Sequence, residues 1–118
     1  MSDPDVKKAI EAHRQKTVAA NQHISLLNAQ IESLNIKFKR SEIIESELVR
    51  LPEDVTTYKA CGKMFVKKPM GDIIEDIKKE RTRITENIET TKKTRDTVSN
   101  GLNESKEALR ELLNSKQT

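Results

Sequence analysis

Apolar side chains recur at alternating spacings of three and four residues along two long segments of the chain. This spacing is typical of the heptad repeat of a coiled-coil helix, in which one apolar stripe faces a partner helix. In the first segment the repeat falls at Val6, Ile10, His13, Thr17, Ala20, Ile24, Leu27, Ile31, Leu34 and Phe38. In the second it falls at Met70, Ile74, Ile77, Arg81, Ile84, Ile88, Thr91, Arg95, Val98, Leu102, Ser105, Leu109 and Leu112. The pattern predicts two long amphipathic helices.

The bounds of these helices follow from capping and helix-breaking residues. Asp3-Pro4-Asp5 supplies an N-cap, a proline at the first helical position and an acid in the first turn, and all three favour a helix start. Neither glycine nor proline interrupts the helix that is predicted over 4–51. A second helix is predicted over 70–116, after the last proline of the chain.

The first repeat changes near the centre of the chain. In the original register Ser41 and Glu45 would lie on the stripe, whereas Ile44, Leu48 and Leu51 follow a shifted register. The sequence therefore predicts a slip of the heptad repeat, with a bend or a change of face in the helix.

The central segment, 53–68, has a different composition. Strand-forming residues flank Gly62, and they are Val55, Thr56, Thr57 and Tyr58 on one side and Met64, Phe65 and Val66 on the other. This arrangement predicts a β-hairpin over 53–68.

The sequence leaves two registers of this hairpin open. A two-residue turn at Cys61-Gly62 would place Tyr58 opposite Phe65, and a three-residue turn ending at Gly62 would pair Tyr58 with Met64. In either register both outer edges would carry unpaired N–H and C=O groups, and an isolated hairpin is marginal in water. Pairing with equivalent segments of other subunits is therefore expected.

Two helices joined by so short a segment most simply pack as an antiparallel pair. The predicted fold class is mainly α, an antiparallel two-helix coiled coil with a short central β-hairpin. The second stripe also carries Arg81 and Arg95, and a charge at a core position lowers stability while often fixing register. On this ground the substitution Arg81→Leu is expected to stabilise the chain.

The composition limits both the core and the partners of the chain. Of its 118 residues, 35% are charged and 34% hydrophobic, but only 3% are aromatic, so the core must be thin. The 22 basic and 19 acidic residues are spread along the whole length and leave a formal net charge of +3. This mixed-sign surface disfavours nucleic-acid binding, and no dense Arg/Lys run adjoins the heptads.

No pattern indicates catalysis, a metal or a cofactor. Cys61 has no histidine near it in sequence and is expected to be a turn residue. His13 and His23 do not share a helix face, and neither has a second histidine or cysteine at ligand spacing. A phosphate-binding glycine loop, a signal peptide and a membrane-spanning segment are not indicated either. The expectation is a non-enzymatic cytoplasmic protein without cofactor or membrane contact.

Between the two helical segments the chain reads Tyr58-Lys59-Ala60-Cys61-Gly62-Lys63-Met64-Phe65-Val66. Its specific part is a Tyr-x-x-x-Gly-basic-Met-Phe-aliphatic pattern. Set between coiled-coil helices of this length, the pattern resembles the β-class subunits of prefoldin, as a single domain over 1–118. Two features depart from that family: Cys61 replaces a more typical aliphatic residue, and Pro69-Met70-Gly71 is a weaker helix start than expected.

The resemblance implies a subunit of an ATP-independent co-chaperone, a hexamer of two α-class and four β-class subunits. Their hairpins would form a β-barrel hub from which the coiled coils extend. In that family the free ends of the coiled coils hold non-native clients, notably actin and tubulin chains. The clients are then passed to the cytosolic group II chaperonin.

The resemblance and the pattern together suggest two sets of functional residues. Those expected at the hub are Tyr58, Gly62, Met64, Phe65 and Val66. Those expected to contact clients near the free ends are Val6, Ile10, Leu102, Leu109, Leu112 and Leu113. Alternatively, the hairpin packs on its own helices and the end residues only close the coiled coil. Leu113 best separates client contact from closure of the coiled coil, because it falls beside the heptad stripe rather than on it.

A different function also fits a heptad-rich chain. The helices could dimerise in parallel and act as a plain scaffold or tether that holds no client. A parallel dimer favours an uninterrupted rod, whereas this sequence is broken at Pro52, Gly62, Pro69 and Gly71. The hairpin arrangement, and with it the chaperone hypothesis, is therefore preferred.

Overall fold

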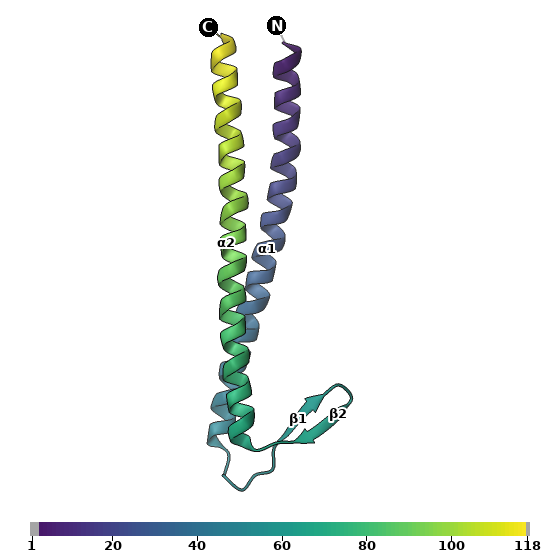
Figure 1. The fold of residues 1–118 in the computed structure, drawn as a ribbon, viewed down its shortest axis with the longest axis vertical. Helices are drawn as coiled ribbons and strands as arrows, with labels where there is room; N and C mark the ends of the chain where they lie inside the picture. The colour runs from purple at the N-terminus through teal and green to yellow at the C-terminus, as the bar shows by residue number, and fades with distance from the viewer. Residues whose placement is uncertain (1–2, 118) are drawn as a thin grey trace. The chain divides into compact units, whose positions relative to one another are not determined.

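The chain forms two long α-helices with a short antiparallel β-hairpin between them (Figure 1). The computed structural model describes residues 3–117. In chain order the elements are α1 (Pro4–Arg50), β1 (Tyr58–Cys61), β2 (Met64–Lys67) and α2 (Met70–Gln117). This is the mainly α fold that the heptads predict.

Capping explains where α1 begins and ends. The Asp5 N–H donates to Asp3 Oδ1 at 2.9 Å, and the Lys7 N–H donates to the Asp3 carbonyl at 3.0 Å. Asp3 is thus the N-cap that the sequence predicts. At the other end the Leu51 N–H donates to the Leu48 carbonyl at 3.2 Å, which tightens the last turn just before a proline.

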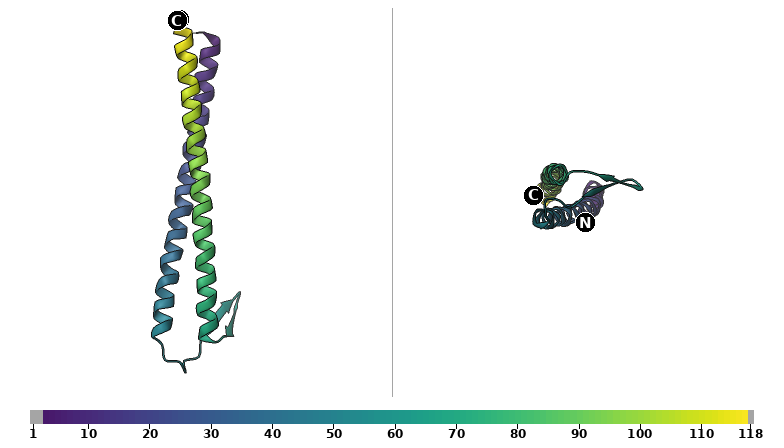
Figure 2. Two further views of the ribbon diagram at one scale, coloured as in Figure 1. Left: turned by 60° about the vertical axis from the view of Figure 1, so that its left-hand side comes forward. Right: turned by 90° about the horizontal axis from the view of Figure 1, so that it is seen from below.

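The chain divides into two compact units, and parts of both helices contribute to each. The described part of the first unit comprises residues 3–31 and 90–117, and the second unit comprises Glu32–Glu89. Within each unit the α1 and α2 segments lie side by side and run antiparallel (Figures 1 and 2).

The seam of the first unit combines apolar and polar layers. Leu27 and Ile31 are 7% exposed and form its buried core. Beside them the Arg95 guanidinium donates through Nη1 to Asn28 Oδ1 across the seam at 3.1 Å. Arg95 therefore has a polar partner, although the heptad pattern places it at a core position.

The seam of the second unit corrects the predicted slip of the repeat. Ser41 is buried and Glu45 partly buried, so both stay on the original stripe, whereas Ile44 is 43% exposed. The reason is a partner on α2: Arg81 Nε donates to Ser41 Oγ at 3.1 Å, and Arg81 Nη2 donates to Glu45 Oε2 at 2.7 Å. Ile84 lies nearby in sequence and is the most buried apolar side chain, at 5% exposed.

The hairpin corrects both predicted registers. Tyr58 pairs with Lys67, so the two-residue turn is Gly62-Lys63. Gly62 has a φ of 63°, and no non-glycine residue among 3–117 has a positive φ. A glycine with positive φ at the first central position, followed by a residue with negative φ, fits a type II′ turn. The sequence could not separate this turn from the alternatives, because all of them contain Gly62.

The base of the hairpin is closed by Thr57 and Lys68, just outside the strands. The Lys68 N–H donates to the Thr57 carbonyl at 3.0 Å, and Thr57 Oγ1 donates to the Lys68 carbonyl. Thr57 is only 8% exposed. Val55 and Thr56, which were expected in the hairpin, precede β1 instead.

Candidate assembly and client-binding sites

The hairpin presents apolar side chains on both faces. Side chains alternate between the two faces along each strand, so the observed register places Tyr58 and Phe65 on one face and Met64 and Val66 on the other. The predicted direct pair of Tyr58 with Phe65 is therefore a diagonal neighbour on one face.

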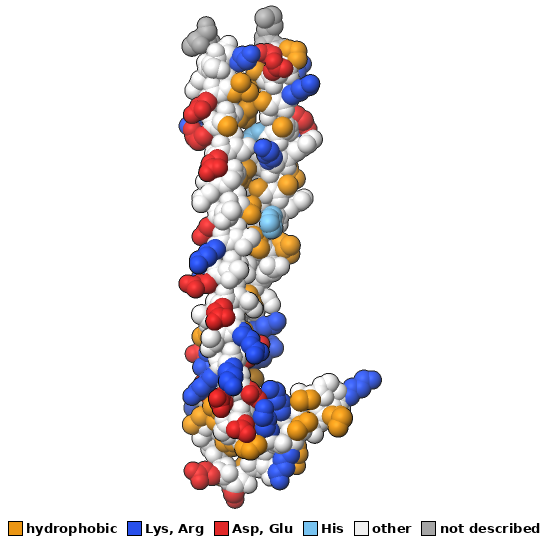
Figure 3. All heavy atoms as spheres, in the orientation of Figure 1, with side chains coloured by type: hydrophobic (Ala, Val, Ile, Leu, Met, Phe, Trp, Pro, Cys, Tyr) orange, Lys and Arg blue, Asp and Glu red, His pale blue; other side chains and the backbone are white. Residues whose placement is uncertain are grey.

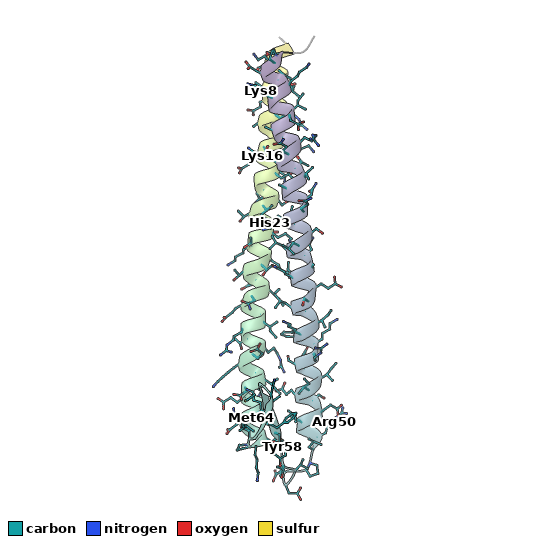
Figure 4. The ribbon with its side chains drawn as sticks, turned by 90° about the vertical axis from the view of Figure 1, so that its right-hand side faces the viewer. Lys8, Lys16, His23, Arg50, Tyr58 and Met64 are labelled. Carbon is teal, nitrogen blue, oxygen red and sulfur yellow. The ribbon has the colours of Figure 1, made fainter. Side chains whose placement is uncertain are left out.

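All four of these side chains are open to solvent. Phe65 is 75% exposed, Met64 69%, Tyr58 60% and Val66 45%. Hydrophobic side chains gather on the projecting hairpin in the face shown by Figure 3, and Figure 4 labels Tyr58 and Met64 on it. The alternative in which the hairpin packs on its own helices therefore does not describe this structure.

Both outer edges of the hairpin are available for pairing. Among residues 3–117 the sheet has two strands, so each strand has one partner and one free edge. In Figure 1 and in the left view of Figure 2, β1 lies between β2 and α2. An extended segment of another chain could add most directly to the outer edge of β2 by backbone hydrogen bonds, because the outer edge of β1 faces α2.

A single carboxylate on α2, that of Asp76, forms ion pairs with two lysines of the hairpin segment. Asp76 accepts a hydrogen bond from Lys59 Nζ of β1 at 3.0 Å and a second one from Lys68 Nζ, at the base of the hairpin. Among the described residues both ion pairs between the hairpin segment and α2 end on this carboxylate. We call this three-residue arrangement, Lys59–Asp76–Lys68, the lysine clamp.

The lysine clamp shifts the pKa values of Asp76 and Lys68. Hydrogen bonds from Lys68 and Lys59 lower the pKa of the Asp76 carboxyl to about 2. The hydrogen bond that Lys68 donates to Asp76 in turn raises the pKa of Lys68, and the nearby charge of Asp72 acts in the same direction. Asp76 and Lys68 are therefore both ionised at neutral pH.

A groove of about 460 Å³ separates β1 from α2. Ile73 and Ile77 of α2 form its apolar wall, with Tyr58 of β1 on the other side. Lys59 and Asp76 of the lysine clamp also line it. The hairpin is thus spaced from α2 and tied to it through charged side chains.

The predicted client-binding residues lie in the first unit, near the two ends of the described chain. Ile10 is 46% exposed, whereas Val6, Leu102, Leu109, Leu112 and Leu113 are partly buried. Lys116 Nζ pairs with Asp3 Oδ2 at 3.0 Å, which brings the two helix ends together. The partial burial of Leu113 favours a role in closing the helix pair, so Ile10 is the most accessible candidate.

A small hollow of about 180 Å³ lies beside these residues. Its wall includes Ala9, Ala12 and Ala108, whose short side chains leave space between the helices, together with Leu109 and Leu112. A polar layer adjoins it, because His13 Nδ1 lies 3.0 Å from Ser105 Oγ on the opposite helix. The end of the helix pair therefore has space that small residues leave unfilled.

Sequence reasoning missed the lysine clamp and the closing pair at Thr57. The available signal was an acidic face on α2, with Asp72, Asp76 and Glu80 spaced four residues apart, facing a lysine-rich hairpin. For metals the structure offers no candidate, since residues 3–117 contain no group of three or more His, Cys, Asp or Glu side chains that could hold an ion.

Comparisons with known proteins identify the family. A family model described as "Prefoldin subunit" matches residues 11–116. The chain belongs to the prefoldin subunit family. Curated relatives named prefoldin subunit 1 include those of Danio rerio, 24% identical over 98% of this chain and 94% of the relative, and Homo sapiens, 23% identical over 94% and 91%. The likeness to β-class subunits, and to prefoldin subunit 1 in particular, is confirmed.

A solved structure supports the same fold. The crystal structure of the prefoldin beta subunit from Thermococcus strain KS-1 superposes with a TM-score of 0.75, at 16% identity, over 94% of each chain. As a prefoldin subunit the chain has a chaperone-cofactor role, and the family that it matches is not a catalytic one. None of its described helices combines the length and apolarity needed to cross a membrane.

Proposed function

We propose that this prefoldin subunit assembles through its hairpin into a heterohexamer of two α-class and four β-class subunits, which holds non-native polypeptides without ATP. The observation that carries the proposal is the exposure of four large apolar side chains on a hairpin with two free edges. Exposed apolar surface next to unpaired strand edges favours association with other strands.

The hub contact is proposed to comprise the residues that the sequence indicates. Phe65 and Tyr58 would pack on one face, Met64 and Val66 on the other, and Gly62 would permit the tight turn. Burying these side chains between subunits removes a large apolar area from water, which is the main driving force for association.

Client binding is proposed for the end of the first unit. Ile10 offers an exposed apolar side chain there, and Val6, Leu102, Leu109, Leu112 and Leu113 would add to it where the helix ends separate. Helix ends open more readily than helix centres, because they have fewer neighbours. Contacts of this kind suit unfolded chains, which expose apolar groups of no fixed arrangement.

The remaining parts of the proposal follow from the family. Non-native actin- or tubulin-like chains are the proposed clients, and a cytosolic group II chaperonin is the proposed acceptor. The proposed compartment is the cytoplasm. Neither a membrane nor a nucleic acid is a proposed partner, and the mixed-sign surface with a net charge of +3 agrees with this.

Co-expression with an α-class prefoldin subunit tests the proposal. The mass of the purified complex should equal that of a hexamer containing four copies of β-class subunits. Without ATP the complex should suppress aggregation of a chemically denatured client. If the two subunits elute separately and the client aggregates as fast as alone, a scaffold or tether function replaces the chaperone function.

The variant Phe65→Asp tests the hub contact. A charge at this 75% exposed position should abolish the hexamer while the helical circular dichroism of the chain stays unchanged. Val49→Asp is a matched control, since Val49 is 65% exposed but lies on α1. A hexamer that survives Phe65→Asp, or that is lost equally in both variants, would refute this contact.

A further inference from the structure

We propose that Asp76 is a positioning residue for assembly, which holds the hairpin in one orientation on α2 through Lys59 and Lys68. The inference rests on the proposed assembly function and adds to it a residue outside the hairpin. It predicts that assembly depends on a side chain of α2 that lies outside the hairpin.

The geometry places the two tethers at different points of the hairpin. Lys59 lies within β1, and Lys68 lies one residue beyond β2. Their ammonium groups converge on the same carboxylate, Asp76 Oδ2. A single tether would leave the hairpin free to rotate about it, whereas two tethers, one within β1 and one just beyond β2, restrict both rotation and tilt.

Backbone connections alone leave the orientation of the hairpin less restricted. On one side the hairpin joins α1 through residues 51–57, and on the other it joins α2 through Lys68 and Pro69. The groove of about 460 Å³ keeps β1 away from the apolar wall formed by Ile73 and Ile77. Close packing therefore does not replace the lysine clamp as a constraint between β1 and α2.

The charges in the lysine clamp are partly shielded from solvent. The side chain of Asp76 is 28% exposed, and those of Lys68 and Lys59 are 34% and 46% exposed. Ion pairs at this depth are less screened by salt than fully exposed pairs. The neighbouring carboxylates Asp72 and Glu80 lie one turn away on the same helix and do not reach a hairpin lysine within ion-pair distance.

Fixing the orientation of the hairpin lowers the cost of assembly. A mobile hairpin must lose its orientational freedom when its strands pair with a neighbour, and this loss weakens binding. With the lysine clamp in place, that freedom is already restricted in the free subunit. Removing the clamp should therefore weaken association by about tenfold while leaving the hairpin contact residues intact.

The test compares full-length chains with substitutions on α2. Asp76→Asn removes the charge, and Asp76→Glu keeps it on a longer side chain. Glu80→Gln is the matched control, because it makes the same change in net charge one turn away and lines the same groove. For each variant the dissociation constant is measured with an α-class prefoldin subunit from the same organism, by titration at fixed salt.

A distance measurement in the isolated full-length chain provides the second readout. Cys61 is exposed on the hairpin and is the single cysteine of the sequence, so one added cysteine at Glu86→Cys on α2 completes a spin-label pair. The distribution of distances between the two labels should be narrow in the parent chain and in Glu80→Gln. It should broaden in Asp76→Asn and narrow again in Asp76→Glu.

The outcomes separate this inference from the proposed function. Weaker association and a broad distance distribution in Asp76→Asn alone support the positioning role. If all variants associate equally, or if Asp76→Asn and Glu80→Gln weaken association equally, the positioning role is refuted and the proposed function stands. If even the parent chain fails to associate, the proposed function fails, and the distance distributions alone decide whether Asp76 orients the hairpin.

Discussion

Arg81 shows how a charged residue is accommodated at a coiled-coil position. Its guanidinium spans the seam to Ser41 and Glu45, and its Cζ atom lies 5.9 Å from the centre of the Phe38 ring, within cation–π range. Ser41 Oγ in turn donates to the Phe38 carbonyl at 2.7 Å. No buried side-chain N or O atom of this layer lacks a hydrogen-bond partner, which removes most of the penalty expected for a charge at the seam.

These partners reverse the effect predicted for Arg81→Leu from the sequence. The substitution would leave Glu45 partly buried, with Lys78 at 3.8 Å as its remaining ion-pair partner. We therefore expect the melting temperature to fall by about 4 °C, measured by circular dichroism. Arg83→Leu is the control, because Arg83 is 72% exposed and should change little. A rise in melting temperature for Arg81→Leu would contradict the stabilising role of this layer.

Ile10 and Val18 provide a matched test of client contact. Both belong to the first unit, and they are 46% and 47% exposed, but only Ile10 lies near the end of the helix pair. In the assembled complex Ile10→Ser should raise the amount needed for half-suppression of client aggregation about threefold, because it removes an accessible apolar contact. Val18→Ser should not. Equal effects of the two changes would place client contact elsewhere.

At the scale of elements, the hairpin and the helices use glycine in opposite ways. Gly62 needs a positive φ for the turn between β1 and β2, whereas Gly101 lies inside α2. A Cβ atom at either position would meet nothing within 4 Å, so neither effect involves a clash. Replacing glycine by alanine is therefore expected to destabilise the structure at Gly62 and to stabilise it at Gly101.

Gly62→Ala should cost about 1–2 kcal/mol in hairpin formation, because an L-residue is strained at this φ. The expected readout is weaker association with the α-class subunit and no change in helical circular dichroism. Gly101→Ala should instead stabilise α2 by about 0.5–1 kcal/mol and raise the melting temperature. The prediction fails if both substitutions shift stability in the same direction.

The lysine clamp should respond to pH in a defined window. The pKa of Asp76 is lowered from 3.8 to about 2, so its pairing with the lysines contributes fully above about pH 4. This contribution is lost as the pH falls through about 2, where the carboxylate is protonated. The distance between labels at Cys61 and Glu86→Cys should broaden between pH 4 and pH 2, a change that Asp76→Asn should not show. An identical pH profile in both chains would exclude Asp76 as the titrating group.

The sequence predicted the bounds of the helices well, but it did not predict which residues contact each other across the helix pair or across the hairpin. Pro4, Pro52 and the heptads indicated the helix bounds, because capping and periodicity are local properties of the chain. The slip predicted near Ser41 was wrong because the heptad pattern of one helix does not include Arg81 on the other. Both predicted hairpin registers were wrong for a similar reason. The hydrogen bonds between Thr57 and Lys68 close the base of the hairpin, and neither residue belongs to the turn from which those registers follow.

The sequence suggested candidate residues for the two sites, but it did not predict how exposed each of them is. The strand pattern and the family resemblance suggested Tyr58 and Phe65 as hub residues, and the structure leaves both open to solvent. Proximity to the chain ends suggested Leu113 and Leu112 as client contacts, and both are partly buried. Exposure depends on packing between distant parts of the chain, which periodicity alone cannot predict.

For the whole molecule, the thin core makes stability depend on partners. Among residues 3–117 the buried apolar side chains are Leu27, Ile31 and Ile84, and no side chain is fully buried. A chain that buries so little gains much of its stability from whatever binds its folded form.

The melting temperature should therefore depend on the assembly partners. With an α-class subunit at 100 times the dissociation constant, binding contributes about 2.7 kcal/mol, which corresponds to a rise of about 10 °C for a chain of this size. Differential scanning calorimetry of the mixture measures this rise. Phe65→Asp should abolish it, and a rise that persists in this variant would mean that stabilisation does not require the hairpin contact.

The layer formed by Ser41, Glu45 and Arg81 also limits how the gene can change in length. An insertion or deletion in α1 between Glu45 and the hairpin would move that carboxylate past its guanidinium partner. A matching change in α2 before Arg81 would be needed to bring the two back into line. Natural variants should therefore gain or lose residues between Glu45 and Arg81 mainly in the segment that connects α1 to β1 or in the turn, where no helix register is disturbed.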